Sequence, residues 1–479
     1  MGHVLRLGAA LFLLEESCNV YAVVSGRCAV LIEAGSGAIL DFLADLGVER
    51  VTDVLCTHLD RDSVEGLQRL SQHGARLWAP VTEQEQFLSL VREHSLPCQF
   101  RFLEDYQTLT LEACEFQVVP TPGHTTGSVS FVLEMNGKRH AFTGDLLSGP
   151  GTVVSLAATQ WSYNGGEGLV GSILSLLDLR DRRVEVLLPT HGHPMGDAEA
   201  AIDLTVGKLW QLVSLRRHNP RLFQFRERPF EEVTRHLLNN RTAFSYQYFL
   251  LSEAGKALAI DFGYDFFFGR PAGTGRATRR PWLYNISTLK REFGVTSVDV
   301  VLPTHYHDDH VAGINLLRAV EGTQVWVPEV FADVLASPEG HLLPCRWFDP
   351  IPADRVLSLD EPFTWEEYEL RLHHLPGHTF YAVAVEFVVD GKRVLAAGDQ
   401  FSDPDGLGLN YVYENIFDPT DYLQSARLLE RVRPDLIVSG HGPVLQVTPD
   451  FLAQLAARGR ELERLHAELL ARAEGRSDT

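Results

Sequence analysis

The chain has 479 residues, of which 45% are hydrophobic and 22% are charged. This balance is typical of a soluble globular protein with about two to four domains. The chain has 42 Lys and Arg residues and 63 Asp and Glu residues, so its net charge is −21. Because this charge repels nucleic acids and anionic membranes, we expect neither as a partner. No apolar run approaches the roughly 20 residues of a membrane helix.

The N-terminal residues 4–14 are apolar and superficially resemble a signal peptide, but no small-residue cleavage site follows them. They lead into two further apolar runs, 21–24 and 29–32, which are typical of strands. We therefore expect the first strands of a fold and a cytoplasmic protein. The six cysteines form no C-x-x-C pair, and we expect them to be buried free thiols.

Several motifs occur twice in the same order. Pro122-Gly123-His124-Thr125 and Thr143-Gly144-Asp145 recur 254 positions later as Pro376-Gly377-His378-Thr379 and Ala397-Gly398-Asp399. Two more motifs recur at similar spacing, Thr57-His58 as Thr304-His305 and His191-Gly192 as His441-Gly442. The pattern indicates a tandem duplication of a domain of roughly 200–220 residues, an ordinary domain size. We expect domains at 1–215 and 238–479, a linker at 216–237, and a helix at the C-terminal end.

Within each copy, strand and helix signals alternate. Asn136-Gly137 and Asp390-Gly391 each lie between apolar runs, which predicts two β-hairpins. The apolar runs 299–302 and 435–438 end directly at loops that contain histidine. The sequence therefore predicts that functional histidines lie at the ends of strands.

The densest cluster of metal-binding side chains is Thr304-His305-Tyr306-His307-Asp308-Asp309-His310. Imidazole and carboxylate are common ligands of zinc and other transition metals. His305 and His307 can bind one ion, and Asp309 and His310 can bind a second. His378, Asp399 and His441 follow in order, each beside a predicted strand end.

This order of H-x-H-x-D-H, His, Asp and His resembles that of the metallo-β-lactamase-fold hydrolases, most closely their glyoxalase II-like branch. The resemblance extends from about Tyr248 to Val444. It implies an α/β (α+β) protein of two tandem four-layer αββα sandwiches with metals at one edge. By similarity, one metal site comprises His305, His307 and His378, the other comprises Asp309, His310 and His441, and Asp399 bridges them.

The resemblance also implies a dinuclear hydrolase with two divalent ions. We expect zinc, with iron or manganese as alternatives. A metal-bound hydroxide would cleave an ester, thioester or lactone of a small molecule. Asp309 is the candidate catalytic residue, because its carboxylate can orient the water or take its proton.

The first half departs from this pattern. Asp60 stands where the second histidine is expected, and Ser63 stands where the third is expected. We therefore expect this half to be catalytically silent, as a scaffold or lid. Its candidate residual metal site comprises His58, Asp60, Asp62, His124, Asp145 and His191. His193 could replace a lost ligand, but we expect it to face solvent.

Candidate substrate contacts are Tyr306, Tyr381 and Arg270. Tyr306 lies within the histidine cluster and Tyr381 follows His378, although packing aromatics would fit at both positions equally well. Arg270 lies in an arginine-rich insertion that could meet an anionic substrate, although a solvated loop is the simpler interpretation.

Other functions remain open. Persulfide dioxygenases, which belong to the same fold, bind one iron through two histidines and one aspartate; here these would be His305, His378 and Asp399. A nuclease-type phosphodiesterase is a further alternative, because the long tRNA maturation endonuclease also pairs a degenerate first half with an active second half. The last alternative is a binding scaffold without catalytic activity. We expect a small-molecule substrate, and a homodimer is an open alternative to a monomer.

Overall fold

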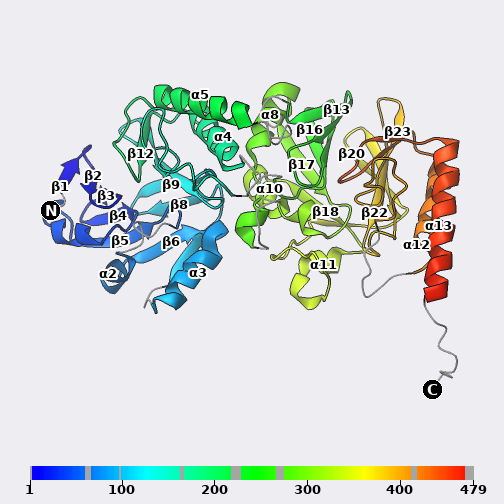
Figure 1. Ribbon diagram of the computed structural model, residues 1–479, viewed down its shortest axis with the longest axis horizontal. Coiled ribbons are helices and arrows are strands. Elements are labelled where there is room, and N and C mark those ends of the chain that lie inside the picture. Colours follow the sequence, from blue (N-terminus) through cyan, green and yellow to red (C-terminus); the bar gives the residue numbers. More distant parts are fainter. Residues whose placement is uncertain are drawn as a thin grey trace, which may run out of the picture. The chain divides into compact units, whose positions relative to one another are not determined.

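The computed structural model describes residues 3–59, 66–95, 99–161, 167–216, 228–265, 275–410 and 418–469. The chain divides into two compact units. The first unit comprises Met1–Glu227 and Phe267–Arg280, and the second comprises Arg228–Phe266 and Pro281–Thr479. In Figure 1 the colours run from blue at the N-terminus to red at the C-terminus, so the elements of both units can be followed along the chain.

The first unit contains two sheets. The larger has the order β1-β2-β3-β4-β5-β6-β7, and the smaller has the order β12-β11-β10-β9-β8. The larger sheet is formed by β1 (His3–Arg6), β2 (Leu11–Glu15), β3 (Asn19–Ser25), β4 (Cys28–Ile32), β5 (Arg50–Leu55), β6 (Arg76–Pro80) and β7 (Phe100–Leu103). The smaller is formed by β8 (Thr108–Leu111), β9 (Cys114–Pro120), β10 (Val129–Met135), β11 (Lys138–Gly144) and β12 (Val186–Pro189).

Strands β2, β3 and β4 of the larger sheet are mostly buried on both faces. Leu13 of β2 packs with Phe116 and Phe131 of the smaller sheet, whereas its neighbour Leu14 packs with residues of the helical layer such as Phe87. Because successive side chains point to opposite faces, such a strand reads as a continuous apolar run. The first unit thus has a sheet-on-sheet core, and the larger sheet is covered by helices on its other face.

The second unit repeats this topology. Its larger sheet has the order β13-β14-β15-β16-β17-β18-β19, and its smaller sheet has the order β20-β21-β22-β23-β24-β25. The larger is formed by β13 (Phe230–Thr234), β14 (Leu237–Asn240), β15 (Gln247–Leu251), β16 (Lys256–Ile260), β17 (Ser297–Leu302), β18 (Gln324–Pro328) and β19 (Arg355–Leu357). The smaller is formed by β20 (Pro362–Trp365), β21 (Tyr368–His374), β22 (Val383–Val389), β23 (Lys392–Ala396), β24 (Leu436–Val438) and β25 (Leu445–Gln446).

Helices complete the layers of both units. In the first unit they are η1 (Ala38–Phe42), α2 (Leu67–Gln72), η2 (Val81–Glu83), α3 (Gln84–Glu93), α4 (Glu167–Asp181), α5 (Ala198–Arg216) and η3 (Arg276–Arg279). In the second they are α8 (Tyr284–Phe293), α9 (Asp308–Val311), α10 (Ile314–Glu321), α11 (Ala332–Ala336), η4 (Pro338–Gly340), α12 (Asp421–Val432) and α13 (Pro449–Leu469). Leu429 of α12 and Leu455 of α13 pack on Leu395 of β23, which gives the outer helical layer of an αββα sandwich.

The domain boundary differs from the expected one. Residues 216–237 were expected to be a linker, but Phe230–Thr234 forms β13, which pairs antiparallel with β14. Residues 217–227 lie outside the described part of the chain. Segment Phe267–Arg280, expected in the second domain, groups with the first unit. Within this segment, the buried guanidinium of Arg280 bonds Asp105 of the first unit.

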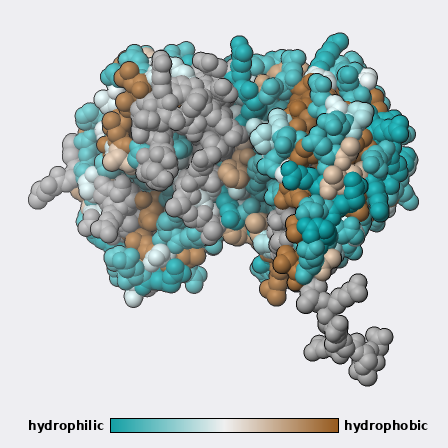
Figure 2. All heavy atoms as spheres, turned by 45° about the vertical axis from the view of Figure 1, so that its right-hand side comes forward, coloured by the Kyte–Doolittle hydropathy of each residue, from teal (hydrophilic) through white to brown (hydrophobic). Residues whose placement is uncertain are grey.

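The surface agrees with the composition. On the face drawn in Figure 2, hydrophilic side chains predominate and hydrophobic ones form smaller groups. Among the described residues, no helix combines the length and apolarity that a membrane crossing requires. Among the described cysteines, Cys18 and Cys56 are buried as expected, whereas Cys28 and Cys114 are partly exposed and Cys345 is exposed.

Candidate metal centre

Strand ends of both sheets supply the candidate ligands of the second unit. His305 and His307 follow β17, and Asp309 and His310 lie in the short helix α9 (Asp308–Val311). His378 follows β21, Asp399 follows β23 and His441 follows β24. These side chains therefore come from one edge of the sandwich, where loops can turn toward a common point.

The structure brings all seven side chains into two groups. Ligand atoms of His305, His307 and His378 lie within 4.8 Å of one another, and so do those of Asp309, His310, Asp399 and His441. His378 Nε2 lies 3.2 Å from His307 Nδ1. The members of each group are those that the resemblance assigned to one metal site, with Asp399 counted in the second group.

Asp399 lies between the two groups. Its Oδ2 is 3.7 Å from His378 Nε2 of the first group and 3.3 Å from His441 Nε2 of the second. Its Oδ1 is 3.1 Å from His310 Nε2. Two carboxylate oxygens placed in this way can serve both groups at once.

A buried carboxylate that sequence reasoning missed orients the histidines. Asp261, which follows β16, accepts hydrogen bonds from the Thr304 backbone N–H at 2.6 Å and from His310 Nδ1 at 2.8 Å. Thr304 Oγ1 donates to Asp261 and lies 3.2 Å from His305 Nδ1. Since Thr304 has one hydroxyl proton, it accepts from His305 Nδ1, which leaves the Nε2 lone pair of His305 for the centre.

Two hydrogen bonds and the preceding glycine position His378. Its Nδ1 donates to the carbonyl oxygen of Asn410 at 3.1 Å, and its backbone N–H donates to Gln400 Oε1 at 2.6 Å. Gly377 precedes it with φ of 148°, and a Cβ there would lie 2.2 Å from Gln400 Nε2. The Pro-Gly-His turn thus needs glycine for the close approach of Gln400.

Burial and neighbouring charges divide the imidazoles into two types. Burial and the adjacent His310 lower the pKa of His305 well below its usual value, and burial lowers the pKa of His378 to about 4. Burial alone would lower the pKa of His441, but hydrogen bonds to Asp309 and Asp399 raise it to about 9. His305 and His378 are therefore neutral imidazoles, the form that binds metals.

The residues present fit divalent transition-metal ions. His305 is fully buried, and its Nε2 has no hydrogen-bond partner among the described residues. A buried polar atom without a partner is costly unless something else binds it. Five imidazoles with two carboxylates are a donor set that suits zinc, iron or manganese.

The three candidate substrate contacts differ in their exposure and in whether the structure describes them. Tyr306 is 1% exposed and packs edge-on against His307 and Tyr381, so it is a packing residue in this structure. Tyr381 is partly exposed and remains a candidate, whereas Arg270 lies outside the described residues. Sequence reasoning missed Phe244, which packs against His441 and against Tyr264. In the sequence, only the position of Phe244 in a loop between two strands could have pointed to it.

The first unit holds a smaller group of the same kind. His58, His124 and Asp145 place one ligand atom each within 4.8 Å of the others, and His191 donates from Nδ1 to Asp145 Oδ1 at 2.7 Å. Asp60, Asp62 and Ser63 lie outside the described residues. The His193 side chain is 92% exposed, so it faces solvent as expected.

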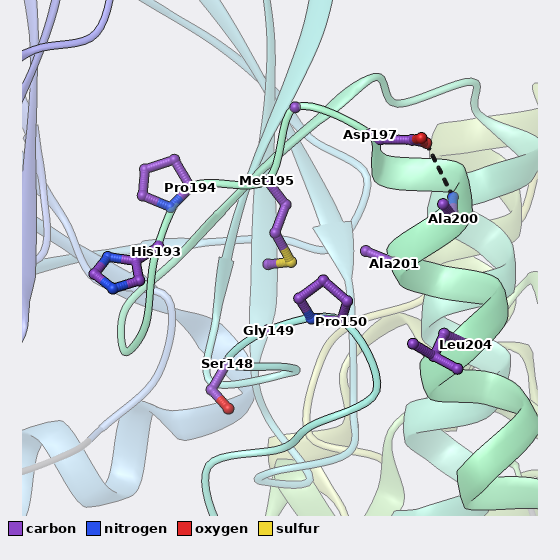
Figure 3. A pocket seen from close by; sticks show the side chains of 11 residues that line it. Ser148, Gly149, Pro150, His193, Pro194, Met195, Asp197, Ala200, Ala201 and Leu204 are labelled. Atoms are coloured by element: carbon purple, nitrogen blue, oxygen red, sulfur yellow. Dashed lines mark hydrogen bonds between the residues drawn. The ribbon is translucent and has the colours of Figure 1, made fainter.

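A separate hollow of about 480 Å³ lies at the N-terminal end of α5 (Figure 3). Pro150, Met195 and Leu204 line it, and Asp197 caps the helix by accepting from the Ala200 N–H. None of its lining residues belongs to the three groups of candidate ligands. The hollow is therefore distinct from the candidate metal centre.

Comparison with known proteins gives one family and several relatives. The model of the metallo-beta-lactamase superfamily matches residues 13–191 and, a second time, residues 247–441. Hydroxyacylglutathione hydrolase of Pseudomonas savastanoi is 32% identical over 128 residues, which is 26% of this chain and 45% of that protein. The chain thus spans less than half the length of this relative.

Two other relatives match over longer stretches. Beta-lactamase-like protein 2 homolog of Drosophila melanogaster is 26% identical over 231 residues, which is 46% of this chain and 71% of that protein. Atrochrysone carboxyl ACP thioesterase of Aspergillus fumigatus is 26% identical over 195 residues, or 40% of this chain and 41% of that protein. With two matched regions that together cover more than half of its length and an αββα topology in duplicate, the chain belongs to the metallo-beta-lactamase superfamily.

Proposed function

We propose that the protein is a metal-dependent hydrolase whose centre lies in the second unit and holds two divalent ions. The observation that carries this proposal is the position of Asp399 between two groups of ligand atoms. The ligands are His305, His307, His378, Asp309, His310, His441 and Asp399. A centre with one iron would use only part of this set, so the geometry favours two ions.

Bound divalent ions supply two things in such a centre, a lowered pKa of bound water and polarisation of a carbonyl group. The protein's own residues accept protons and orient the ligand histidines. Asp309 Oδ2 lies 3.0 Å from His441 Nε2, and the Asp309 carboxylate could receive a proton during attack on an acyl carbon. Asp261 and the Asn410 carbonyl hold His310 and His378 in one tautomer throughout.

The proposed substrate is a small acyl compound, with thioesters ahead of esters and lactones. The relatives support this choice, because their names include a hydroxyacylglutathione hydrolase and an acyl-carrier thioesterase. Phe244 beside His441 offers an apolar surface next to the most exposed of the ligands, which suits the apolar part of an acyl group.

The test is hydrolysis of a panel of small thioesters, esters and lactones by the purified full chain. We expect Asp399→Asn and His441→Ala to lower kcat/KM more than about 100-fold, since loss of residues that only orient ligands already costs about 10–100-fold. His193→Ala, a change of an exposed histidine, is the matched control and should match the wild type. Oxygen uptake with one iron per chain, and no hydrolysis, would contradict the proposal.

A further inference from the structure

We infer that the first unit binds one divalent transition-metal ion of its own, with His58, His124 and Asp145 as its ligands. This inference does not depend on the proposed hydrolase in the second unit. It replaces the expectation that the first half is only a silent scaffold. The three residues follow β5, β9 and β11, at strand ends equivalent to those that bear His305, His378 and Asp399.

The distances fit one shared ion. Asp145 Oδ2 lies 3.6 Å from His58 Nε2 and 3.6 Å from His124 Nε2. These separations are longer than a hydrogen bond. Two ligand atoms bound tetrahedrally to one ion at about 2.1 Å lie about 3.4 Å apart. The three atoms are therefore spaced as ligands are rather than as direct partners of one another.

The two oxygens of Asp145 have different surroundings. Oδ1 accepts a hydrogen bond from His191 Nδ1 at 2.7 Å, which fixes the carboxylate. Oδ2 is buried and accepts no hydrogen bond from the described residues. The Asp145 side chain is fully buried. Burial alone would raise the pKa of its carboxyl, but His191 and His58 hold that pKa below its usual value, so Oδ2 is a charged oxygen that faces two imidazoles. A cation bound between the three side chains would be stabilised by this charge.

The tautomer of His58 is suited to metal binding. Thr57 Oγ1 donates to Glu33 Oε1 at 2.5 Å, so at 2.9 Å it accepts from His58 Nδ1. With Nδ1 held as a donor, Nε2 is the ring nitrogen of His58 that faces Asp145 and His124. Two further buried carboxylates bond the residues on either side of His58: Glu33 accepts from the Thr57 backbone N–H at 3.0 Å, and Glu83 accepts from the Leu59 backbone N–H at 2.6 Å. The surroundings therefore attract a cation.

A comparison of His191 with His441 of the second unit favours one ion rather than two. His441 faces Asp399 and Asp309 through Nε2, whereas His191 faces Asp145 through Nδ1 at hydrogen-bond distance. His191 thus orients a ligand in the first unit. Two nitrogens and one oxygen favour Zn²⁺ or Fe²⁺ over Mg²⁺ or Ca²⁺.

The test is metal content per chain, by elemental mass spectrometry, for three forms of the full-length protein. His124→Ala with Asp145→Asn removes the first-unit ligands, His378→Ala with Asp399→Asn removes those of the second unit, and His193→Ala is the control. We expect the first-unit double variant to lose one ion per chain relative to the control. The second-unit double variant should keep one ion. The element detected tells zinc from iron.

A spectroscopic titration covers the case in which the first-unit variant misfolds. Co²⁺ added to the metal-free second-unit double variant should give visible d–d absorption that saturates at one equivalent. Addition of Asp145→Asn to that variant should abolish the absorption while circular dichroism stays the same. Unchanged metal content in a folded first-unit variant, or no Co²⁺ absorption, would overturn the inference. A single ion lost only with the first-unit ligands would support it while refuting the dinuclear centre of the second unit.

Discussion

At the scale of residues, Asp261 and Glu33 occupy the same position in the two units, directly after β16 and β4. Each accepts hydrogen bonds from the threonine that precedes a candidate ligand histidine, Thr304 for Asp261 and Thr57 for Glu33. Asp261 also accepts from His310 Nδ1. Glu33 Oε2 is buried with no partner among the described residues. One position thus holds two imidazoles in the second unit and one in the first.

Replacement of Asp261 by alanine should weaken metal binding by about 10–100-fold, because His305 and His310 would lose the groups that fix their orientation. Competition with a chromophoric chelator measures the dissociation constant. Asp261→Glu should recover part of the affinity, since the first unit carries glutamate at this position. Asp333→Ala, an exposed aspartate on α11, is the control. Equal affinities for Asp261→Ala and the control would refute this role.

At the scale of elements, the loop that carries His305 to His310 is held by close packing against the segment after β16. A Cβ on Gly263 would lie 1.7 Å from the carbonyl oxygen of Asp309 and 2.3 Å from its carbonyl carbon. Real Cβ atoms do not approach backbone so closely. The glycine is therefore required by the position of the ligand loop.

Gly263→Ala should lower the free energy of unfolding by about 1–3 kcal/mol and reduce metal content, because the ligand loop has to move. Urea unfolding of the full chain gives the first quantity and elemental analysis gives the second. Gly207→Ala is a matched control on an exposed face of α5, where a Cβ meets no atom within 4 Å. That substitution should stabilise the helix by about 1 kcal/mol. A variant at Gly263 as stable as the wild type would contradict the packing argument.

The second-unit ligand set could be predicted from the sequence because each part of it is a short local motif at the end of an apolar run. His305 to His310 lie within six consecutive residues, and His378, Asp399 and His441 follow strands that their own residues define. The role of Asp261 could not be predicted, since it depends on the approach of β16 and β17 in the folded sheet. Phe230–Thr234 was missed as a strand because its Glu231 and Glu232 are exposed, as an edge strand permits.

At the scale of the whole molecule, the second repeat contributes a segment to the first unit. Arg280 is fully buried and binds both carboxylate oxygens of Asp105, at 2.7 and 2.8 Å. Its third nitrogen donates to the carbonyl oxygens of Thr126 and Ser128, just beyond His124. No spacing in the sequence marks this arginine among the several in its insertion. Its partners are known only from the fold.

Arg280→Met should destabilise the first unit by about 3–5 kcal/mol, because Asp105 would remain buried without its cation. Arg280→Lys should not restore stability, since an ammonium group cannot make the same paired hydrogen bonds. Hydrogen exchange followed by mass spectrometry should show faster exchange in residues 121–129 than in the wild type. Arg92→Met, at an exposed arginine of α3, is the control. Exchange as slow as in the wild type would mean that Arg280 does not hold this loop.

Anomalous X-ray scattering from crystals of the full chain, recorded at the absorption edge of the metal found by elemental analysis, tests the central claim most directly. The account predicts two peaks in the second unit, one on each side of the Asp399 carboxylate, with His305, His307 and His378 around one and Asp309, His310 and His441 around the other. A map with no peak in contact with Asp399, or with a single peak bound only by His305, His378 and Asp399, would contradict the dinuclear centre.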